Sequence, residues 1–229
     1  MSHRSSAYQE IFDRTVRLLR ELMEIPDEYE VLLLQGGATG QFAAVPMNLL
    51  KTGADYVDSG NFAHGAFVEA QKYGNARVIA SSREESYARV PDVDAGAIDP
   101  DADYVYITTN NTIYGTRYVE LPETGGVPLV ADMSSNILSE PYDVTRFGAI
   151  YAGAQKNIGP AGATLVIVRR DLLGGAKTLL LGNLIKNELM QARNWPMGAT
   201  LSIAMLLFTF AFILIYKKVT GAKNLGGIR

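Results

Sequence analysis

Three short segments of the sequence carry side chains that could do chemistry: a glycine-rich turn, an aspartate and a lysine, in that order. The glycines of 36–40 let a ligand approach the backbone, and free N–H groups at a helix start can bind an anion. Asp132 follows an apolar run and could pair with a cationic ring nitrogen. Lys156 follows another apolar run among small residues, so we expect partial desolvation to free its amine for Schiff-base chemistry.

Each segment also has an ordinary structural interpretation. Taken singly, the residues do not decide between that interpretation and a chemical role. The glycine-rich segment could be a plain turn, Asp132 could cap a helix, and Lys156 could be a surface lysine whose charge reaches water. Taken together, an anion-binding turn, a carboxylate and an imine-forming lysine make the set of groups that a pyridoxal phosphate site needs.

The elements around these segments predict an α/β fold with a mainly parallel sheet. Short, continuous apolar runs are typical of strands buried on both faces, and ligands of such sheets collect beyond the carboxyl ends of the strands. The first helix should carry one apolar stripe, formed by Tyr8, Ile11, Phe12, Val16, Leu19 and Leu22. We expect strands at 29–34, 55–57, 77–80, 104–107, 128–131, 148–152 and 164–168, and helices at 5–24, 41–50 and 62–72.

Composition narrows the class of protein. The chain has 229 residues, no cysteine and a net charge of −3, which excludes thiolate chemistry and gives no sign of nucleic-acid binding. The charge is uneven: residues 179–229 hold six basic residues and one acidic residue, whereas residues 1–178 hold 15 basic and 23 acidic residues. The net charge of −3 for the whole chain is therefore the sum of an acidic part and a basic part.

Residues 2–177 resemble the phosphoserine aminotransferase family, a class V group of fold-type I pyridoxal phosphate enzymes. The resemblance rests on five stretches, at 2–5, 34–49, 109–115, 131–135 and 151–162. It implies the large domain of such an enzyme, here truncated at both ends.

The resemblance implies a role for each matching residue. Lys156 would be catalytic, holding the cofactor through its amine and moving protons, and Asp132 would keep the pyridine nitrogen protonated. Phe62 stands where the family usually has tryptophan against the ring. The other implied contacts are Ala38, Thr39, Thr112 and Gln155 to the cofactor, Arg4 to the substrate carboxylate, and His3 beside the substrate phosphate.

The family's reaction moves an amino group from L-glutamate to 3-phosphohydroxypyruvate, giving O-phospho-L-serine and 2-oxoglutarate in serine biosynthesis. Related substrates of pyridoxine biosynthesis remain open. Members are cytoplasmic homodimers, and their chains extend further at both ends. We expect the truncation to impair dimerisation and turnover.

Residues 179–229 predict a different kind of segment. Residues 199–216 carry no charge, and as a helix they would span about 27 Å, close to a bilayer core of about 30 Å. A buried core helix is the other interpretation. Residues 181–218 resemble the end of a spermidine/putrescine-type ABC transporter permease. We therefore expect a partial aminotransferase domain at 1–178, with a cytoplasmic catalytic part anchored to the inner or plasma membrane by 199–216.

Two further functions stay open at this stage. The chain could be a membrane transport component whose tail is the functional part, or an inactive fusion of two partial genes joined near residues 178–180.

Overall fold

The computed structural model describes residues 5–173. The chain divides into two units, Met1–Leu173 and Gly174–Arg229. His3, Arg4, the permease-like segment and the expected membrane helix at 199–216 lie outside the described residues, and the domain boundary at 178 stays a prediction. Among residues 5–173, no helix is long and apolar enough to cross a membrane.

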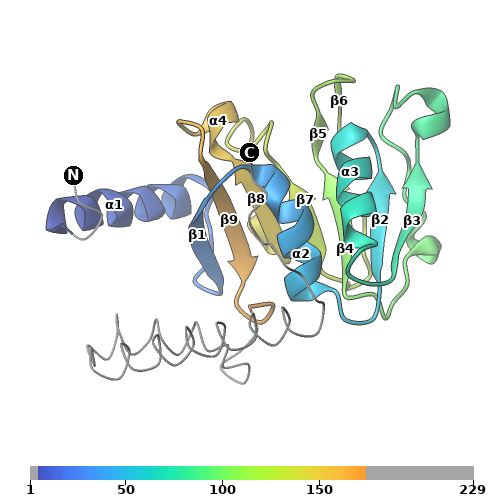
Figure 1. Cartoon of the computed structure of the whole chain (residues 1–229), viewed down its shortest axis with the longest axis horizontal. Coiled ribbons are helices and arrows are strands. Elements are labelled where there is room, and N and C mark those ends of the chain that lie inside the picture. The colour runs from blue at the N-terminus through green and yellow to red at the C-terminus, as the bar shows by residue number, and fades with distance from the viewer. Residues whose placement is uncertain (1–4, 174–229) are drawn as a thin grey trace, which may run out of the picture. The chain divides into compact units, whose positions relative to one another are not determined.

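A seven-stranded sheet forms the centre of the described unit (Figure 1), in the order β1-β9-β8-β7-β4-β2-β3. Four neighbouring pairs are parallel, and β9 runs antiparallel to both β8 and β1. The prediction of an α/β fold with a mainly parallel sheet is therefore confirmed. The strands are β1 (Tyr29–Gln35), β2 (Ala54–Asp58), β3 (Ala76–Ser81), β4 (Tyr104–Thr108), β7 (Leu129–Asp132), β8 (Ala149–Gly153) and β9 (Ala163–Arg169).

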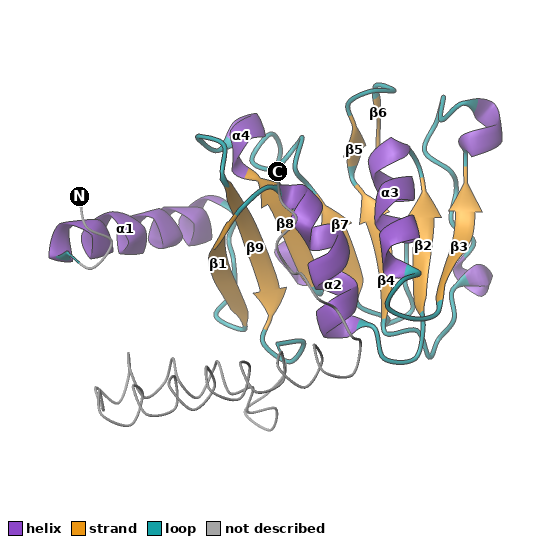
Figure 2. Ribbon diagram, in the orientation of Figure 1, coloured by secondary structure: helices purple, strands orange, loops and turns teal. Residues whose placement is uncertain are grey.

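Helices α2 and α3 lie on one face of this sheet (Figure 2). A short hairpin, β5 with β6, stands beyond the end of β4 and was not predicted. The helices are α1 (Ser6–Leu22), α2 (Gln41–Leu49), α3 (Asn61–Ala70) and α4 (Ala154–Asn157), the hairpin strands are β5 (Asn110–Asn111) and β6 (Thr116–Arg117), and 3-10 turns occur at η1 (Ala38–Gly40), η2 (Arg83–Glu85), η3 (Ala95–Ala97) and η4 (Val144–Arg146).

Alternate side chains of the central strands fill two separate cores, because successive residues of a strand point to opposite faces. Tyr56, Tyr104 and Tyr106 pack with α2 and α3 on one face. Val105 and Ile107 pack with loop residues and the end of α1 on the other face. Every residue of β2, β4 and β8 is buried, as the continuous apolar runs predicted.

The predicted first helix is present as α1, but its apolar stripe is mostly exposed. Leu19 is the single buried residue of the helix, whereas Ile11 and Leu22 are 53% and 68% exposed. The helix extends away from the sheet beside β1 (Figure 1), and Val16 and Leu19 pack against the core.

The carboxyl ends of β1, β4, β7 and β8 meet at one edge of the sheet, since β1 and β8 are both antiparallel to β9. Gly36 ends β1 with a φ of 103°, a conformation that favours glycine. Its N–H donates to the Gly162 carbonyl at 2.9 Å, and the Thr164 hydroxyl donates to the Gly36 carbonyl at 3.0 Å. These bonds fix the start of the glycine-rich turn beside β9.

Candidate functional site

One hollow of about 150 Å³ opens at this carboxyl edge. Residues from four strand ends and two helix starts line it, although the chain separates the first and the last by more than a hundred positions. The lining residues are Gly37, Ala38, Thr39, Phe42, Phe62, Thr108, Asn110, Thr112, Asp132, Ser134, Ser135, Gln155 and Lys156.

Asp132 is the last residue of β7 and is 5% exposed. One of its oxygens, Oδ1, accepts the backbone N–H of Ser134 at 2.8 Å. The segment that follows is a turn and not a helix, so Asp132 does not cap a helix. Burial raises the pKa of the Asp132 carboxyl above its usual range, while hydrogen bonds from Ser134 and the positive charge of Lys156 act in the opposite direction. A buried carboxylate that lines a hollow suits a cationic partner.

Lys156 lies on the one-turn helix α4, directly after β8. It lines the hollow together with Asp132, as the sequence predicted, but its side chain is exposed. The expected desolvation of Lys156 is therefore wrong for the described residues. The reason is that most of α4 lies at the surface, where Gln155, Lys156 and Asn157 are all exposed.

The glycine-rich turn reaches the hollow through Ala38 and Thr39 of η1. A Cβ atom at Gly153 would lie 3.3 Å from the Ala38 Cβ and 2.9 Å from the Gln155 Oε1. A larger residue at 153 would therefore crowd the turn against β8. The 3-10 turn η1 runs directly into α2, and the Gln41 N–H donates to the Ala38 and Thr39 carbonyls. The N-terminal end of this helical segment is therefore the turn itself, which lines the hollow.

Phe62 enters the hollow from the first turn of α3 and is 48% exposed. An exposed aromatic ring beside a hollow offers a face on which a planar ligand could stack. Thr112 lies across the site, beyond the short strand β5, and its hydroxyl accepts a hydrogen bond from the Asn110 amide at 3.4 Å.

Four polar residues of the lining were not among the predicted site residues: Thr108, Asn110, Ser134 and Ser135. The Asn110 amide donates to the Ser135 hydroxyl at 2.8 Å, and that hydroxyl donates back to the Asn110 carbonyl at 2.9 Å. Thr108 is the last residue of β4 and pairs in register with Asp132. The sequence offered one signal for Thr108: it directly follows the predicted apolar strand at 104–107, as Asp132 follows the strand at 128–131.

The structure thus brings seven predicted residues to one hollow and leaves two unplaced. Arg4 and His3 lie outside the described residues. The seven are Ala38, Thr39, Phe62, Thr112, Asp132, Gln155 and Lys156.

The fold and the hollow define an α/β protein with a hollow at the carboxyl edge of its sheet, lined by a glycine-rich turn, a buried acid and a lysine. The model of the class-V aminotransferase family matches residues 1–199. The chain belongs to the class-V aminotransferase family.

Two curated proteins similar to this chain carry the same name. A phosphoserine aminotransferase of Bacillus thuringiensis subsp. konkukian is 59% identical over 178 residues, which cover 77% of this chain and 49% of the relative. Another, of Streptococcus uberis, is 46% identical over 236 residues, which cover all of this chain and 62% of the relative. The chain therefore spans about half to three fifths of the length of these curated relatives.

A solved structure shares the fold. The crystal structure of phosphoserine aminotransferase with bound pyridoxal phosphate from Trichomonas vaginalis superposes with a TM-score of 0.70 at 34% identity, covering 76% of this chain and 52% of the other.

Proposed function

We propose that this chain carries the pyridoxal phosphate site of a phosphoserine aminotransferase, which moves an amino group from L-glutamate to 3-phosphohydroxypyruvate. The observation that carries the proposal is that Asp132 and Lys156 line one hollow with the glycine-rich turn. Relatives up to 59% identical bear the name of this enzyme.

The hollow fits the cofactor in its polar groups. Its lining includes the buried carboxyl of Asp132 and the polar side chains of Asn110, Ser134 and Ser135. A cationic ring nitrogen would offset the desolvation of Asp132.

When bound, pyridoxal phosphate supplies an electron sink and carries the amino group between the two substrates. Lys156 Nζ would hold the cofactor and then move a proton, and its exposed position leaves it free to do both. The Asp132 carboxylate would hold a proton at the ring nitrogen. The Phe62 ring would pack on one face and exclude water from it.

The remaining lining residues would orient the cofactor. Backbone N–H and hydroxyl groups at Ala38 and Thr39, at the N-terminal end of the η1–α2 segment, would bind the phosphate. Thr112 and Gln155, which both line the hollow, would contact the ring substituents. For the substrate, Arg4 would bind the carboxylate and His3 would lie near the phosphate.

The test is a half-reaction on the full chain loaded with pyridoxal phosphate. Addition of L-glutamate should give one 2-oxoglutarate per bound cofactor, and Lys156→Ala should abolish it. A chain that binds the cofactor yet forms no 2-oxoglutarate would refute the aminotransferase activity. Formation of 2-oxoglutarate without subsequent O-phospho-L-serine on addition of 3-phosphohydroxypyruvate would refute the proposed acceptor.

The expected setting of the enzyme is the cytoplasm, as part of a homodimer. The membrane anchor at 199–216 is a separate proposal, supported by the absence of charge over those 18 residues. Fractionation of cells that express the full chain tests it. Retention in membranes after a carbonate wash supports the anchor, whereas release into the supernatant contradicts it.

A further inference from the structure

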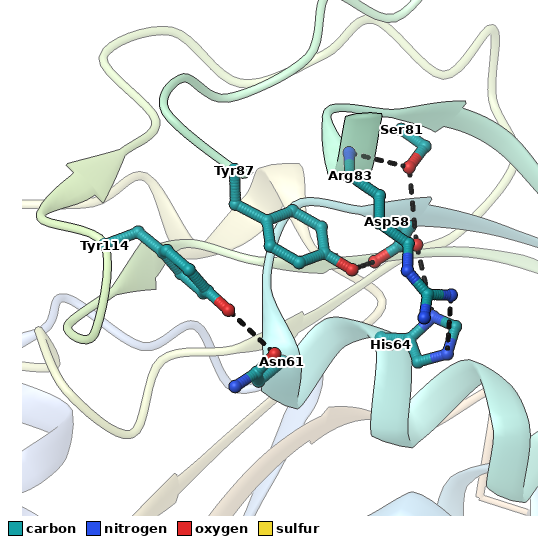
Figure 3. A network of polar contacts seen from close by, with 7 residues as sticks. All are labelled: Asp58, Asn61, His64, Ser81, Arg83, Tyr87 and Tyr114. Carbon is teal, nitrogen blue, oxygen red and sulfur yellow. Dashed lines mark hydrogen bonds and ion pairs between the residues drawn. The ribbon is translucent and has the colours of Figure 1, made fainter. Parts of the chain in front are cut away.

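A second group of polar side chains lies at the same edge of the sheet, beyond the ends of β2 and β3 (Figure 3). Asp58 is the last residue of β2 and is 4% exposed. Its carboxylate contacts three polar groups: the Tyr87 hydroxyl at 3.0 Å, the Ser81 hydroxyl at 3.3 Å and His64 Nδ1 at 3.2 Å. We call Asp58, His64, Ser81, Arg83 and Tyr87 the Asp58 cluster.

The hydrogen of the His64 ring can be placed from its neighbours. Arg83 Nη1 lies 3.3 Å from His64 Nε2, and a guanidinium group can only donate hydrogen bonds. His64 Nε2 therefore accepts, which leaves the ring hydrogen on Nδ1, facing Asp58. His64 thus links the exposed Arg83 to the buried carboxylate (Figure 3).

Tyr87 is held in an unusual backbone conformation. Ser86 and Tyr87 have φ angles of 54° and 58°, which non-glycine residues adopt only when their surroundings hold them there. The Tyr87 ring lies 4.9 Å from the Tyr114 ring between centroids. Burial raises the pKa of Tyr87 to about 12, so its hydroxyl keeps its proton and donates to Asp58 at neutral pH.

These contacts fix the first turn of α3 on both sides. The Tyr114 hydroxyl donates to Asn61 Oδ1 at 2.7 Å, and His64, three residues on, contacts Asp58. A Cβ atom at Gly60 would lie only 2.6 Å from Asn111 Oδ1, so the turn also approaches β5 closely. Phe62 lies between the two fixed positions and lines the cofactor hollow.

We propose that the Asp58 cluster is a positioning device for Phe62, holding the ring where it can stack on the cofactor. This inference rests on the proposed function. The cluster itself does not line the hollow, so it would act only through the backbone of α3. The alternative is a cluster that stabilises the fold without affecting the site, and the test separates the two.

The first arm of the test is a double-mutant cycle on the affinity of the full chain for pyridoxal phosphate. Tyr87→Phe removes one buried hydrogen bond and should weaken the affinity roughly fivefold. In a Phe62→Ala background, the same change should have no effect, because the residue it positions is gone. Equal losses in both backgrounds, or no loss in either, would overturn the proposal.

Matched variants guard against general unfolding. Tyr73→Phe removes a hydroxyl that donates to Glu69 at 3.5 Å just beyond the far end of α3, and it should leave the affinity unchanged. Ser81→Ala removes a weaker donor to Asp58 and replaces Tyr87→Phe if that variant fails to fold. His64→Asn keeps a donor toward Asp58, so it should bind the cofactor more tightly than His64→Ala.

The second arm needs no cofactor, so it distinguishes failure of this inference from failure of the proposed function. Phe62→Trp combined with Trp195→Phe places the chain's only tryptophan at the hollow. Time-resolved fluorescence anisotropy should show a larger amplitude of fast motion after Tyr87→Phe and not after Tyr73→Phe. An unchanged amplitude would refute the positioning role, even in a chain that binds no pyridoxal phosphate.

Discussion

Replacing Asp132 with asparagine should have two opposite effects, weaker cofactor binding and a more stable cofactor-free chain. Asparagine has nearly the same shape and can still accept the Ser134 N–H, which Asp132 Oδ1 accepts at 2.8 Å. What the change removes is the negative charge of a residue that is 5% exposed. The hollow needs that charge only when a cationic ring nitrogen is present.

The loss of affinity follows from the strength of a charged hydrogen bond. Such a bond contributes about 1.5–3 kcal/mol, so the dissociation constant for pyridoxal phosphate should rise roughly 10- to 150-fold. Absorbance titration of the full chain with the cofactor measures this change.

The gain in stability should depend on pH. Burial raises the native pKa of Asp132 above the ordinary value of 3.8, so the native state binds more protons than the unfolded state between those two values. The free energy of unfolding of the unmodified chain therefore falls as the pH rises through that window. Asp132→Asn has no carboxyl group here, so its free energy of unfolding does not fall in this window. Its gain in stability over the unmodified chain should be absent below pH 3.8 and complete above the native pKa of Asp132.

Urea unfolding of both cofactor-free proteins across this pH range is the assay. If the asparagine variant is less stable than the unmodified chain at neutral pH, or equally stable at every pH, then Asp132 is not a desolvated carboxylate without a cationic partner, and the reasoning is refuted.

Three further changes test the packing around the site. Gly60→Ala should weaken pyridoxal phosphate binding in a cofactor titration, because its Cβ would lie 2.6 Å from Asn111 Oδ1 and displace the first turn of α3; unchanged affinity would contradict this. Tyr29→Phe should lower the free energy of unfolding by about 1–3 kcal/mol in urea, since it leaves the buried Phe147 carbonyl without its 2.6 Å donor. Asp103→Ala should lower the melting temperature by several degrees, because Asp103 Oδ2 accepts three successive backbone N–H groups at 2.6–3.1 Å; a change below one degree would show that water replaces it.

The strands of the mainly parallel sheet could be predicted because the buried strands are short, continuous apolar runs. The first three helices were also predicted, whereas the one-turn helix α4 was not. β4 and β8 are buried throughout, and their ends fall within one residue of the predicted ends. Asp132 and Lys156 were likewise found from their place after such runs. The β5–β6 hairpin was missed because two strands of two residues each carry no recognisable pattern.

The exposure of individual side chains and the contacts between side chains distant in the sequence could not be predicted, because both depend on tertiary structure. The apolar stripe of α1 has the pattern of a buried face, yet Leu19 is its one buried residue and Val16 is only partly buried against the core. The small residues before Lys156 suggested burial, but the lysine is exposed. Asp58 and His64 belong to no motif, and their pairing depends on how α3 packs against the end of β2.

The central claim is that Lys156 holds pyridoxal phosphate in the hollow that it shares with Asp132. The most direct measurement adds the cofactor to the full chain, fixes it with borohydride, and maps the modified residue by mass spectrometry. We predict a visible absorbance band before reduction and a single major modified site at Lys156, with both lost in Lys156→Ala. A band that survives in Lys156→Ala, or label spread over surface lysines, would contradict the claim.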